Sequence, residues 1–230
     1  MKTKFLAAEI PVACGNTCFT FSSARNTFSQ IRKPVIIKPH LGSRSRHTTI
    51  HINTEDELRT AFKKAKQLSP WVIVEEELKG NVYRGTLIGG NVVGIIRREL
   101  PHVIADGVST IRTLVERENQ NPKRHGPVFH ELPIDADATS ELLRQGYTWE
   151  SVPPAGTNVT VSQKVSRSFG ASTTDVTDSA HADNVALLEK IGALLKDSLV
   201  GVDFIIENVS RSWRAQDRAG VIECNSLPFV

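Results

Sequence analysis

Acidic and amide side chains near the end of the chain have the types and spacing of a site for a hard metal ion. Asp203 lies in an apolar, β-branched stretch, and Glu223 and Asn225 lie two residues apart in a second one. Residues two apart on a strand share one face of a sheet, so pairing of the two strands would place Asp203 beside them. Carboxylate and amide oxygens suit Mg²⁺, which keeps positions open for phosphates. The competing interpretation is that these acids are solvated groups at a sheet edge.

A lysine earlier in the chain could contribute to the same chemistry. Lys38 lies at the end of an apolar run and precedes a polar loop that contains Arg44 and Arg46. A lysine in this position can contact a polyphosphate while loop N–H groups hold the rest of it. The alternative is a solvated lysine at a strand end, which is the commoner situation.

Three consecutive acids and a basic pair are further candidates. Glu75, Glu76 and Glu77 follow an apolar strand, and successive strand side chains alternate between faces, so the three cannot all point one way. They could form a nucleotide hinge, in which one Glu and backbone groups accept from an adenine amino group, or a solvated acidic edge. Arg97 and Arg98 could clamp phosphate or carboxylate bidentately, although a basic pair is most often a surface feature.

The bulk composition limits the classes of protein that remain. The chain has 230 residues and a net charge of +3, which is too mild to imply nucleic acid binding. Its three cysteines are odd in number and predict reduced thiols in the cytoplasm rather than a disulfide framework. No apolar run approaches the length of a membrane span, and the apolar stretch at the start is too short for a signal peptide.

The elements that must position these residues are predicted from periodicity and caps. A capping box is expected at Thr54 and Glu57, which begins a helix that Pro70 ends. Ser109 is expected to cap another helix, and residues 166–178 are expected to form a loop. Helices are predicted near residues 3–9, 54–65, 109–119, 138–145 and 181–195. Strands are predicted at 34–39, 48–52, 71–74, 83–88, 92–96, 201–207 and 220–228.

A set of short motifs follows a definite order along the chain. The set includes Val72-Ile73-Val74-Glu75, Gly80-Asn81-Val82-Tyr83-Arg84, Ile104-Ala105-Asp106-Gly107, Gln145-Gly146-Tyr147-Thr148, Gly201-Val202-Asp203 and Glu223-Cys224-Asn225. In this order the motifs resemble the ATP-grasp superfamily. They are similar to the ATP-grasp region of cyanophycin synthetases and of fused glutamate–cysteine ligase/glutathione synthetases. The resemblance covers nearly the whole chain.

The resemblance implies an α+β fold in which two α+β subdomains with antiparallel sheets clasp ATP. An N-terminal segment would cover residues 1–33, the lid subdomain 34–97, and the C-terminal subdomain with the metal site 98–230. The N-terminal domain that precedes the ATP-grasp region in the family is expected to be lacking.

The resemblance also implies roles for individual residues. Lys38 would bind the ATP phosphates, and Arg98 would contact phosphate or the acyl-phosphate. The remaining nucleotide contacts would come from Glu75, which faces the adenine amino group, and from Glu76, Glu77, Leu78, Arg44 and Arg46. Asp203, Glu223 and Asn225 would hold Mg²⁺ or Mn²⁺, with Glu223 bridging two ions.

The implied activity is that of an ATP-dependent, ADP-forming carboxylate–amine ligase. It would form an amide or peptide bond between amino acids or short peptides through an acyl-phosphate, in the cytoplasm. A partner domain or a second subunit could complete the enzyme, whereas nucleic acid and membrane partners are not expected. The alternative is a non-catalytic or partial ATP-grasp module that binds nucleotide or a partner chain. Ser45 and His47 at glycine positions of the lid loop, and Val82 at the position of a ribose-binding acid, favour that alternative.

Overall fold

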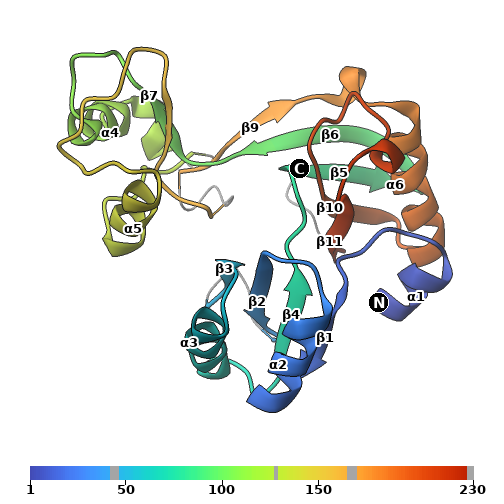
Figure 1. The fold of residues 1–230 in the computed structure, drawn as a ribbon. Helices are drawn as coiled ribbons and strands as arrows, with labels where there is room; N and C mark the ends of the chain where they lie inside the picture. The colour runs from blue at the N-terminus through green and yellow to red at the C-terminus, as the bar shows by residue number, and fades with distance from the viewer. Residues whose placement is uncertain (42–46, 127–128, 165–169, 227–230) are drawn as a thin grey trace. The chain divides into compact units, whose positions relative to one another are not determined.

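The chain leaves one folded unit and later returns to it. The structure is a computed structural model and describes residues 1–41, 47–126, 129–164 and 170–226. Unit 1 comprises Met1–Ile95 and Val176–Val230, and unit 2 is the intervening Ile96–Asp175 (Figure 1). The predicted limits 1–33, 34–97 and 98–230 do not follow this division, because strand pairing returns the end of the chain to unit 1.

The first sheet of unit 1 separates an apolar face from a polar one. Its strands have the order β1 (Gly15–Cys18), β4 (Val72–Glu76), β2 (Val35–Pro39) and β3 (Thr49–Ile52), and all pairs are antiparallel. Buried and half-buried residues alternate along β2 and β4. The helices α2 (Phe21–Gln30) and α3 (Glu55–Lys66) cover the buried face through residues such as Phe28, Leu58 and Phe62. Lys38 and Glu75 fall at the half-buried positions of their strands.

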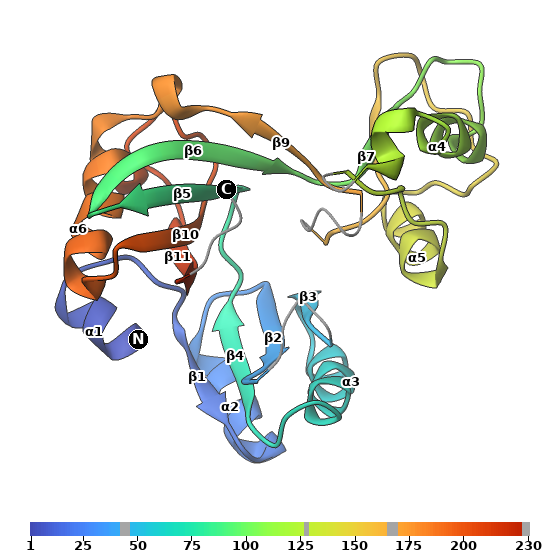
Figure 2. The same cartoon turned by 180° about the vertical axis from the view of Figure 1, so that it is seen from behind.

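The second sheet of unit 1 contains the two strands at the end of the chain. Its order is β11 (Gly220–Asn225), β10 (Leu199–Ile206), β5 (Asn81–Ile88) and β6 (Asn91–Glu99). The helices α1 (Lys2–Ala7) and α6 (Ala182–Leu195) pack in one cluster on this sheet, where Phe5 and Leu188 meet Val202 and Phe204 (Figure 2). Short 3₁₀ turns occupy Thr177–Ser179 and Trp213–Ala215.

Unit 2 has a small core of its own. The far part of β6 pairs with β9 (Ser172–Asp175), and β7 (His102–Ile104) pairs with β8 (Asn158–Thr160). The helices α4 (Ile111–Asn119) and α5 (Ala136–Arg144) and the 3₁₀ helix η1 (Pro122–His125) complete the unit. Its buried side chains include those of Val103, Ile111, Leu142 and Val159.

Most predicted elements are present, and the predicted α+β class with antiparallel sheets is confirmed. The Thr54–Glu57 capping box is present, with both reciprocal bonds formed. Thr110, not Ser109, caps α4, because the Ser109 hydroxyl donates to Asp106 at 2.7 Å. Among the described residues, no helix has the length and apolarity needed to cross a membrane.

Several elements were not predicted, among them the short strands β1, β7 and β8, the strand β9 and the helix α2. Residues 166–178 were expected to form a loop, but the structure places strand β9 within them. β9 lacks large apolar residues and is formed by its pairing with β6. Helix α2 was also missed, although Phe21, Ala24 and Phe28 recur at helical spacing and Thr20 caps the helix by accepting from Ser23 N–H.

Candidate functional site

The two strands at the end of the chain pair as the sequence predicts. Asp203 on β10 lies opposite Glu223 on β11, and Gly201 lies opposite Asn225. A bulge at Asp203/Phe204 shifts the register at this point, and such irregularities commonly redirect side chains near functional sites. The structure therefore brings the three predicted metal ligands into one neighbourhood.

An arginine that the sequence did not indicate lies in the middle of this group. Arg84 on β5 is opposite Asp203 in the sheet. Its Nε and Nη2 donate to the two Asp203 carboxylate oxygens at 2.6 and 2.7 Å, and the two side chains are only 11% and 3% exposed. In the orientation that satisfies both of its groups, the Asn225 amide accepts from Arg84 Nη2 at 3.1 Å and donates to Glu223 Oε1 at 2.9 Å.

The electrostatics of this group are dominated by its acids. The pKa of the intervening Cys224 thiol is raised to about 12, first by burial and then by the negative charges of Asp203 and Glu223. Arg84 is the cation that balances them in the structure, and a bound metal ion would add further positive charge. This local excess of negative charge is what a cation site requires.

The donor set fits a hard divalent cation. It consists of two carboxylates and one amide, all with oxygen donors, which suits Mg²⁺, Mn²⁺ or Ca²⁺. The described residues contain no group of three His, Cys, Asp or Glu side chains that could hold a metal ion. The set proposed here has two such side chains, Asp203 and Glu223, and its third member is the amide of Asn225. Each carboxylate oxygen has two lone pairs, so the bonds from Arg84 to Asp203 leave acceptor capacity for a cation.

A cavity of about 560 Å³ in unit 1 joins the other predicted residues to this group. Lys38, Glu75 and Glu223 all line it, together with Lys2 from helix α1. Glu75 lies between the two lysines: Lys38 Nζ is 2.9 Å from Glu75 Oε2, and Lys2 Nζ is 3.0 Å from Oε1. Lys2 was not predicted as a site residue, because nothing local in the sequence indicates that the side chain of a residue on helix α1 reaches strand β4.

The charge of Glu75 is stabilised by these two lysines. Burial alone would raise the pKa of its carboxyl, but the charges and hydrogen bonds of Lys38 and Lys2 outweigh burial and leave the pKa lowered. Glu75 is therefore ionised at neutral pH, with two ammonium groups around one carboxylate. This excess of positive charge lines a cavity wide enough for a polyphosphate.

The consecutive acids diverge, as alternation predicts. Glu76 accepts from the Cys14 backbone N–H at 3.0 Å on the other side of the strand. Glu77 accepts from the His51 backbone N–H at 2.7 Å and pairs with the His51 ring at 2.8 Å. Leu78 is buried. Glu75 faces the lysines rather than an unoccupied hinge, and an adenine contact for Glu75, Glu76, Glu77 and Leu78 stays a prediction.

The remaining predicted residues are not joined to this cavity by the structure. Arg98 belongs to unit 2, where it lies opposite Thr173 on β9, so its contact with phosphate stays a prediction. Arg44 and Arg46 lie outside the described residues.

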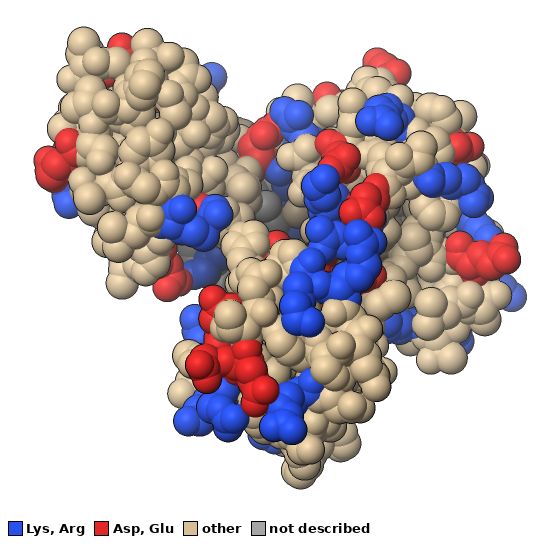
Figure 3. Space-filling model, in the orientation of Figure 1, with Lys and Arg blue, Asp and Glu red and all other residues tan. Residues whose placement is uncertain are grey.

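Exposed ion pairs occur elsewhere on the described surface. Figure 3 shows acidic side chains beside basic ones on one face of the molecule. Arg32 forms two bonds with Asp217 at 2.9 and 3.1 Å, and Lys79 pairs with Glu207. These pairs are much more exposed than Arg84 and Asp203. The Arg32–Asp217 pair therefore has two bonds like the Arg84–Asp203 pair but differs from it in burial.

Comparison with solved structures identifies the fold. A bifunctional glutathione synthetase from Pasteurella multocida matches 97% of this chain and 31% of its own, with a TM-score of 0.64 and 24% identity. A D-alanine–D-alanine ligase from Bacillus anthracis matches 99% of this chain and 55% of its own, with a TM-score of 0.57 and 14% identity. The fold is that of the ATP-grasp ligases.

Sequence comparison adds a relative of higher identity than these solved structures. A cyanophycin synthetase from Trichormus variabilis is 34% identical over 198 residues, which are 85% of this chain. The matched region is 22% of that relative, so the chain spans less than a quarter of its length. No family model matches the chain. The predicted resemblance to cyanophycin synthetases and to bifunctional glutathione-forming enzymes is confirmed.

Proposed function

We propose that this chain is the ATP-binding part of an ADP-forming carboxylate–amine ligase. The observation that carries the proposal is the cavity lined by Lys2, Lys38, Glu75 and Glu223, with Asp203 and Asn225 beside Glu223. Cationic side chains on one side and oxygen donors on the other are what a metal–polyphosphate complex requires. The ATP-grasp fold of the chain, and its similarity to ligases, support the same assignment.

The proposed reaction has two steps. A carboxylate oxygen attacks the γ-phosphorus of ATP, the bond to the β-phosphate oxygen breaks, and ADP leaves. An amine nitrogen then attacks the acyl carbon, inorganic phosphate departs with its electron pair, and the nitrogen loses a proton. Phosphoryl transfer depends mainly on positioning and charge neutralisation, so no covalent protein nucleophile is required.

Each side chain has a defined part in this scheme. Lys38 and Lys2 would exchange their contact with Glu75 for the phosphate oxygens, which replaces one anion by another around the same ammonium groups. Asp203, Glu223 and Asn225 would hold Mg²⁺ or Mn²⁺, which would neutralise charge on the phosphates. Arg84 holds the Asp203 carboxylate in place through two hydrogen bonds.

The substrates are proposed to be amino acids or short peptides, in line with the similar enzymes. Arg98 is proposed to contact the phosphate or the acyl-phosphate. Because the chain spans only part of its relatives, a partner domain or a second subunit is proposed to supply the rest of the amine site. We place the enzyme in the cytoplasm, in keeping with its three cysteines free of disulfide bonds.

The decisive experiment compares Glu223→Gln with the wild type. ADP release from ATP in the presence of amino acids and hydroxylamine, which traps acyl-phosphates, should fall at least about a hundredfold in the variant. Glu207→Gln is the matched control, because Glu207 is an acid directly after strand β10 but is paired with Lys79 at the surface. Binding of Mn²⁺ with a non-hydrolysable ATP analogue provides a readout independent of turnover. Equal ADP release and equal Mn²⁺ binding by Glu223→Gln and wild type would overturn the proposal.

A second candidate function is a non-catalytic nucleotide-binding module. Its supporting observation is that Arg84 already occupies both oxygens of Asp203, a positive charge at the place where a metal ion is expected. Such a module would bind an ATP analogue with the same affinity in the presence and absence of Mg²⁺ and would show no turnover. The ligase requires affinity to rise with Mg²⁺, so calorimetric titration with and without the metal separates the two.

A further inference from the structure

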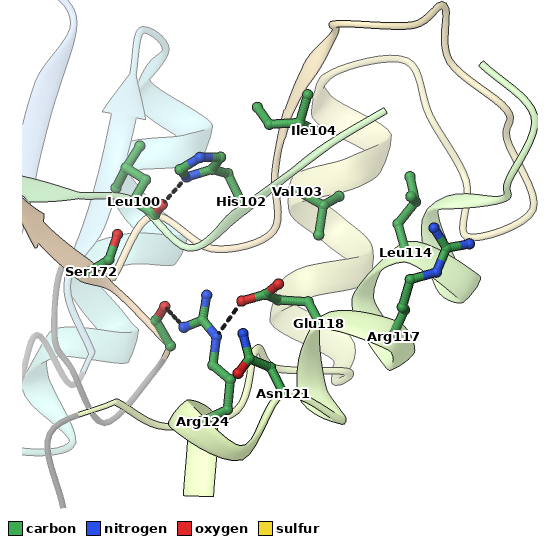
Figure 4. A pocket seen from close by; sticks show the side chains of 11 residues that line it. Leu100, His102, Val103, Ile104, Leu114, Arg117, Glu118, Asn121, Arg124 and Ser172 are labelled. Atoms are coloured by element: carbon green, nitrogen blue, oxygen red, sulfur yellow. Dashed lines mark hydrogen bonds and ion pairs between the residues drawn. The ribbon is translucent and has the colours of Figure 1, made fainter. Parts of the chain in front are cut away.

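Unit 2 contains a second cavity, which the proposed ligase chemistry does not use. It has a volume of about 500 Å³ and lies between strand β7, one face of helix α4, the 3₁₀ helix η1 and the start of β9 (Figure 4). All the residues that line it belong to unit 2. A cavity of this size accommodates a small organic molecule rather than a single ion.

One wall of the cavity is apolar and the other is polar. Leu100, Val103, Ile104 and Leu114 supply aliphatic surface. The polar wall comes from helix α4 and the turn that follows it. Arg117 and Glu118 lie three and four residues after Leu114 and therefore on the same side of the helix, and Asn121 is the N-cap of η1. A ligand that satisfies both walls needs an apolar body and a polar end.

Arg124 is the best placed group to receive that polar end. Its side chain is only 12% exposed, and its Nε donates to Glu118 at 2.9 Å while its Nη1 donates to the Gly170 carbonyl at 2.7 Å. Within the described part of the chain these bonds leave Nη2 without a recorded partner, and Figure 4 shows this nitrogen directed into the cavity. Nη1 also donates to the His130 carbonyl at 3.3 Å, and a guanidinium fixed by these bonds is a pre-organised donor for an anion.

Two neighbouring side chains add donors. The Asn121 amide oxygen already accepts from the Lys123 backbone N–H at 3.1 Å, so its NH₂ group is the part that can serve a ligand. The Ser172 hydroxyl also lines the cavity. With Arg124, these groups form a set of donors. Glu118 pairs with Arg124 at 2.9 Å, and the more exposed Arg117 pairs with Asp106 at 3.4 Å, so the donors rather than an excess of charge define the site. This set suits a singly charged carboxylate.

His102 supplies an acceptor on the same cavity. Its Nδ1 is 2.7 Å from the Leu100 carbonyl, which can only accept, so Nδ1 carries the hydrogen. In the neutral ring, Nε2 is then an acceptor, which suits an amide N–H. An amide N–H next to a carboxylate is the chemistry of a peptide end, whereas a simple fatty acid would leave Nε2 without a donor.

We propose that this cavity binds the carboxyl-terminal end of a short peptide, with Arg124, Asn121 and Ser172 donating to the carboxylate. His102 accepts the last amide N–H, and the aliphatic wall holds an apolar side chain. The site is independent of the proposed ligase activity, since it involves no residue of the Lys38–Glu223 cavity.

The test measures binding of three probes to the whole chain by chemical-shift perturbation and calorimetry. N-acetyl-Ala-Leu with a free carboxylate, the same dipeptide as its carboxamide, and 4-methylpentanoate present the peptide end, the uncharged peptide and the free acid. We expect the acid dipeptide to bind at least about tenfold more tightly than the carboxamide, which lacks the charge-assisted bonds. Equal binding of the two dipeptides would overturn the proposal, and tighter binding of 4-methylpentanoate would reassign the site to free organic acids.

Asn121→Asp is the diagnostic variant. It keeps the oxygen that accepts from Lys123 N–H but replaces the donor group by a negative charge, so binding should fall at least about tenfold. Asn208→Asp is the matched control: Asn208 likewise accepts from a backbone N–H two residues on, that of Ser210, and lies in unit 1. Ser172→Ala, which removes one donor without adding charge, should weaken binding several-fold. Unchanged affinity in both Asn121→Asp and Ser172→Ala, with unchanged melting temperatures, contradicts the site.

Discussion

Arg84 binds the Asp203 carboxylate through two nearly parallel hydrogen bonds, although the two residues are 119 positions apart in the chain. Both side chains are almost fully buried. A buried carboxylate that loses its partner retains the full cost of its desolvation. The pair therefore connects the stability of unit 1 to the geometry of the candidate metal site.

Replacing Arg84 by Met should lower the free energy of unfolding by about 3–5 kcal/mol, because the buried Asp203 carboxylate would lose both hydrogen bonds from the Arg84 guanidinium. Urea denaturation measures this difference. Arg32→Met is the matched control, since Arg32 makes the same two-bond contact with Asp217 while 62% and 49% of the two side chains are exposed. Arg32→Met should lower the free energy of unfolding by less than about 1 kcal/mol. Similar losses in both variants would show that burial does not set the value of the Arg84–Asp203 pair.

The ionised state of Glu75 should appear in the pH dependence of stability. Its pKa is lower in the folded chain than its ordinary value of 4.5, so the unfolded state binds more protons as pH falls below that value. The stabilisation from the Lys2 and Lys38 contacts is therefore present above about pH 4.5 and is lost at lower pH. The difference in unfolding free energy between wild type and Glu75→Gln should shrink as pH is lowered from 6 to 3. A difference that stays constant over this range would contradict the lowered pKa.

Gly80 should be far less replaceable than Gly90. Gly80 has φ of +126°, and a Cβ at this position would lie 2.2 Å from the Ile206 carbonyl carbon. Gly80→Ala should therefore cost at least about 3 kcal/mol, from a disfavoured backbone conformation and a clash with the backbone of β10. Gly90 also has a positive φ, of +87°, but an added Cβ there meets no described atom within 4 Å. Gly90→Ala should cost about 1–2 kcal/mol, and thermal unfolding of the two variants tests the difference.

The three cysteines should differ in reactivity. Cys224 has a pKa raised to about 12 by burial and by Asp203 and Glu223, so almost none of it is thiolate at pH 8. Cys14 is exposed, although burial of its thiol and the nearby Glu76 raise its pKa as well. Alkylation of the native chain with iodoacetamide, followed by peptide mass analysis, should modify Cys14 first and Cys224 only on unfolding. Cys14→Ser should abolish the early phase; an early phase that persists in this variant would assign the fast reaction elsewhere.

Local patterns predicted the elements of the candidate site but not all of its contacts. The Thr54–Glu57 cap and the strands that contain Lys38, Asp203 and Glu223 could be predicted because each depends on residues close in sequence. Arg84 could not, because its significance depends on the pairing of β5 with β10, a register that no local pattern specifies.

Lys2 illustrates the same limit at the other side of the cavity. Its contact with Glu75 spans 73 residues and requires that the Lys2 side chain of α1 reach strand β4 of the first sheet. Strand β9 was not predicted because Ser172–Asp175 has no apolar pattern. It is a strand because it pairs with β6. The features that the sequence did not predict, Arg84, Lys2 and β9, all depend on contacts between residues far apart in the chain.

The ends of unit 2 have a consequence for the modularity of the chain. Ile96 and Asp175 are paired opposite each other on β6 and β9, so the whole of unit 2 is inserted between two adjacent strand positions. In topological terms it is one very long hairpin loop of unit 1, and the entropic cost of closing a loop rises by only about 0.6 kcal/mol for each doubling of its length. Insertions of very different size can therefore be exchanged at this point at little cost to the sheet that carries Arg84 and Asp203.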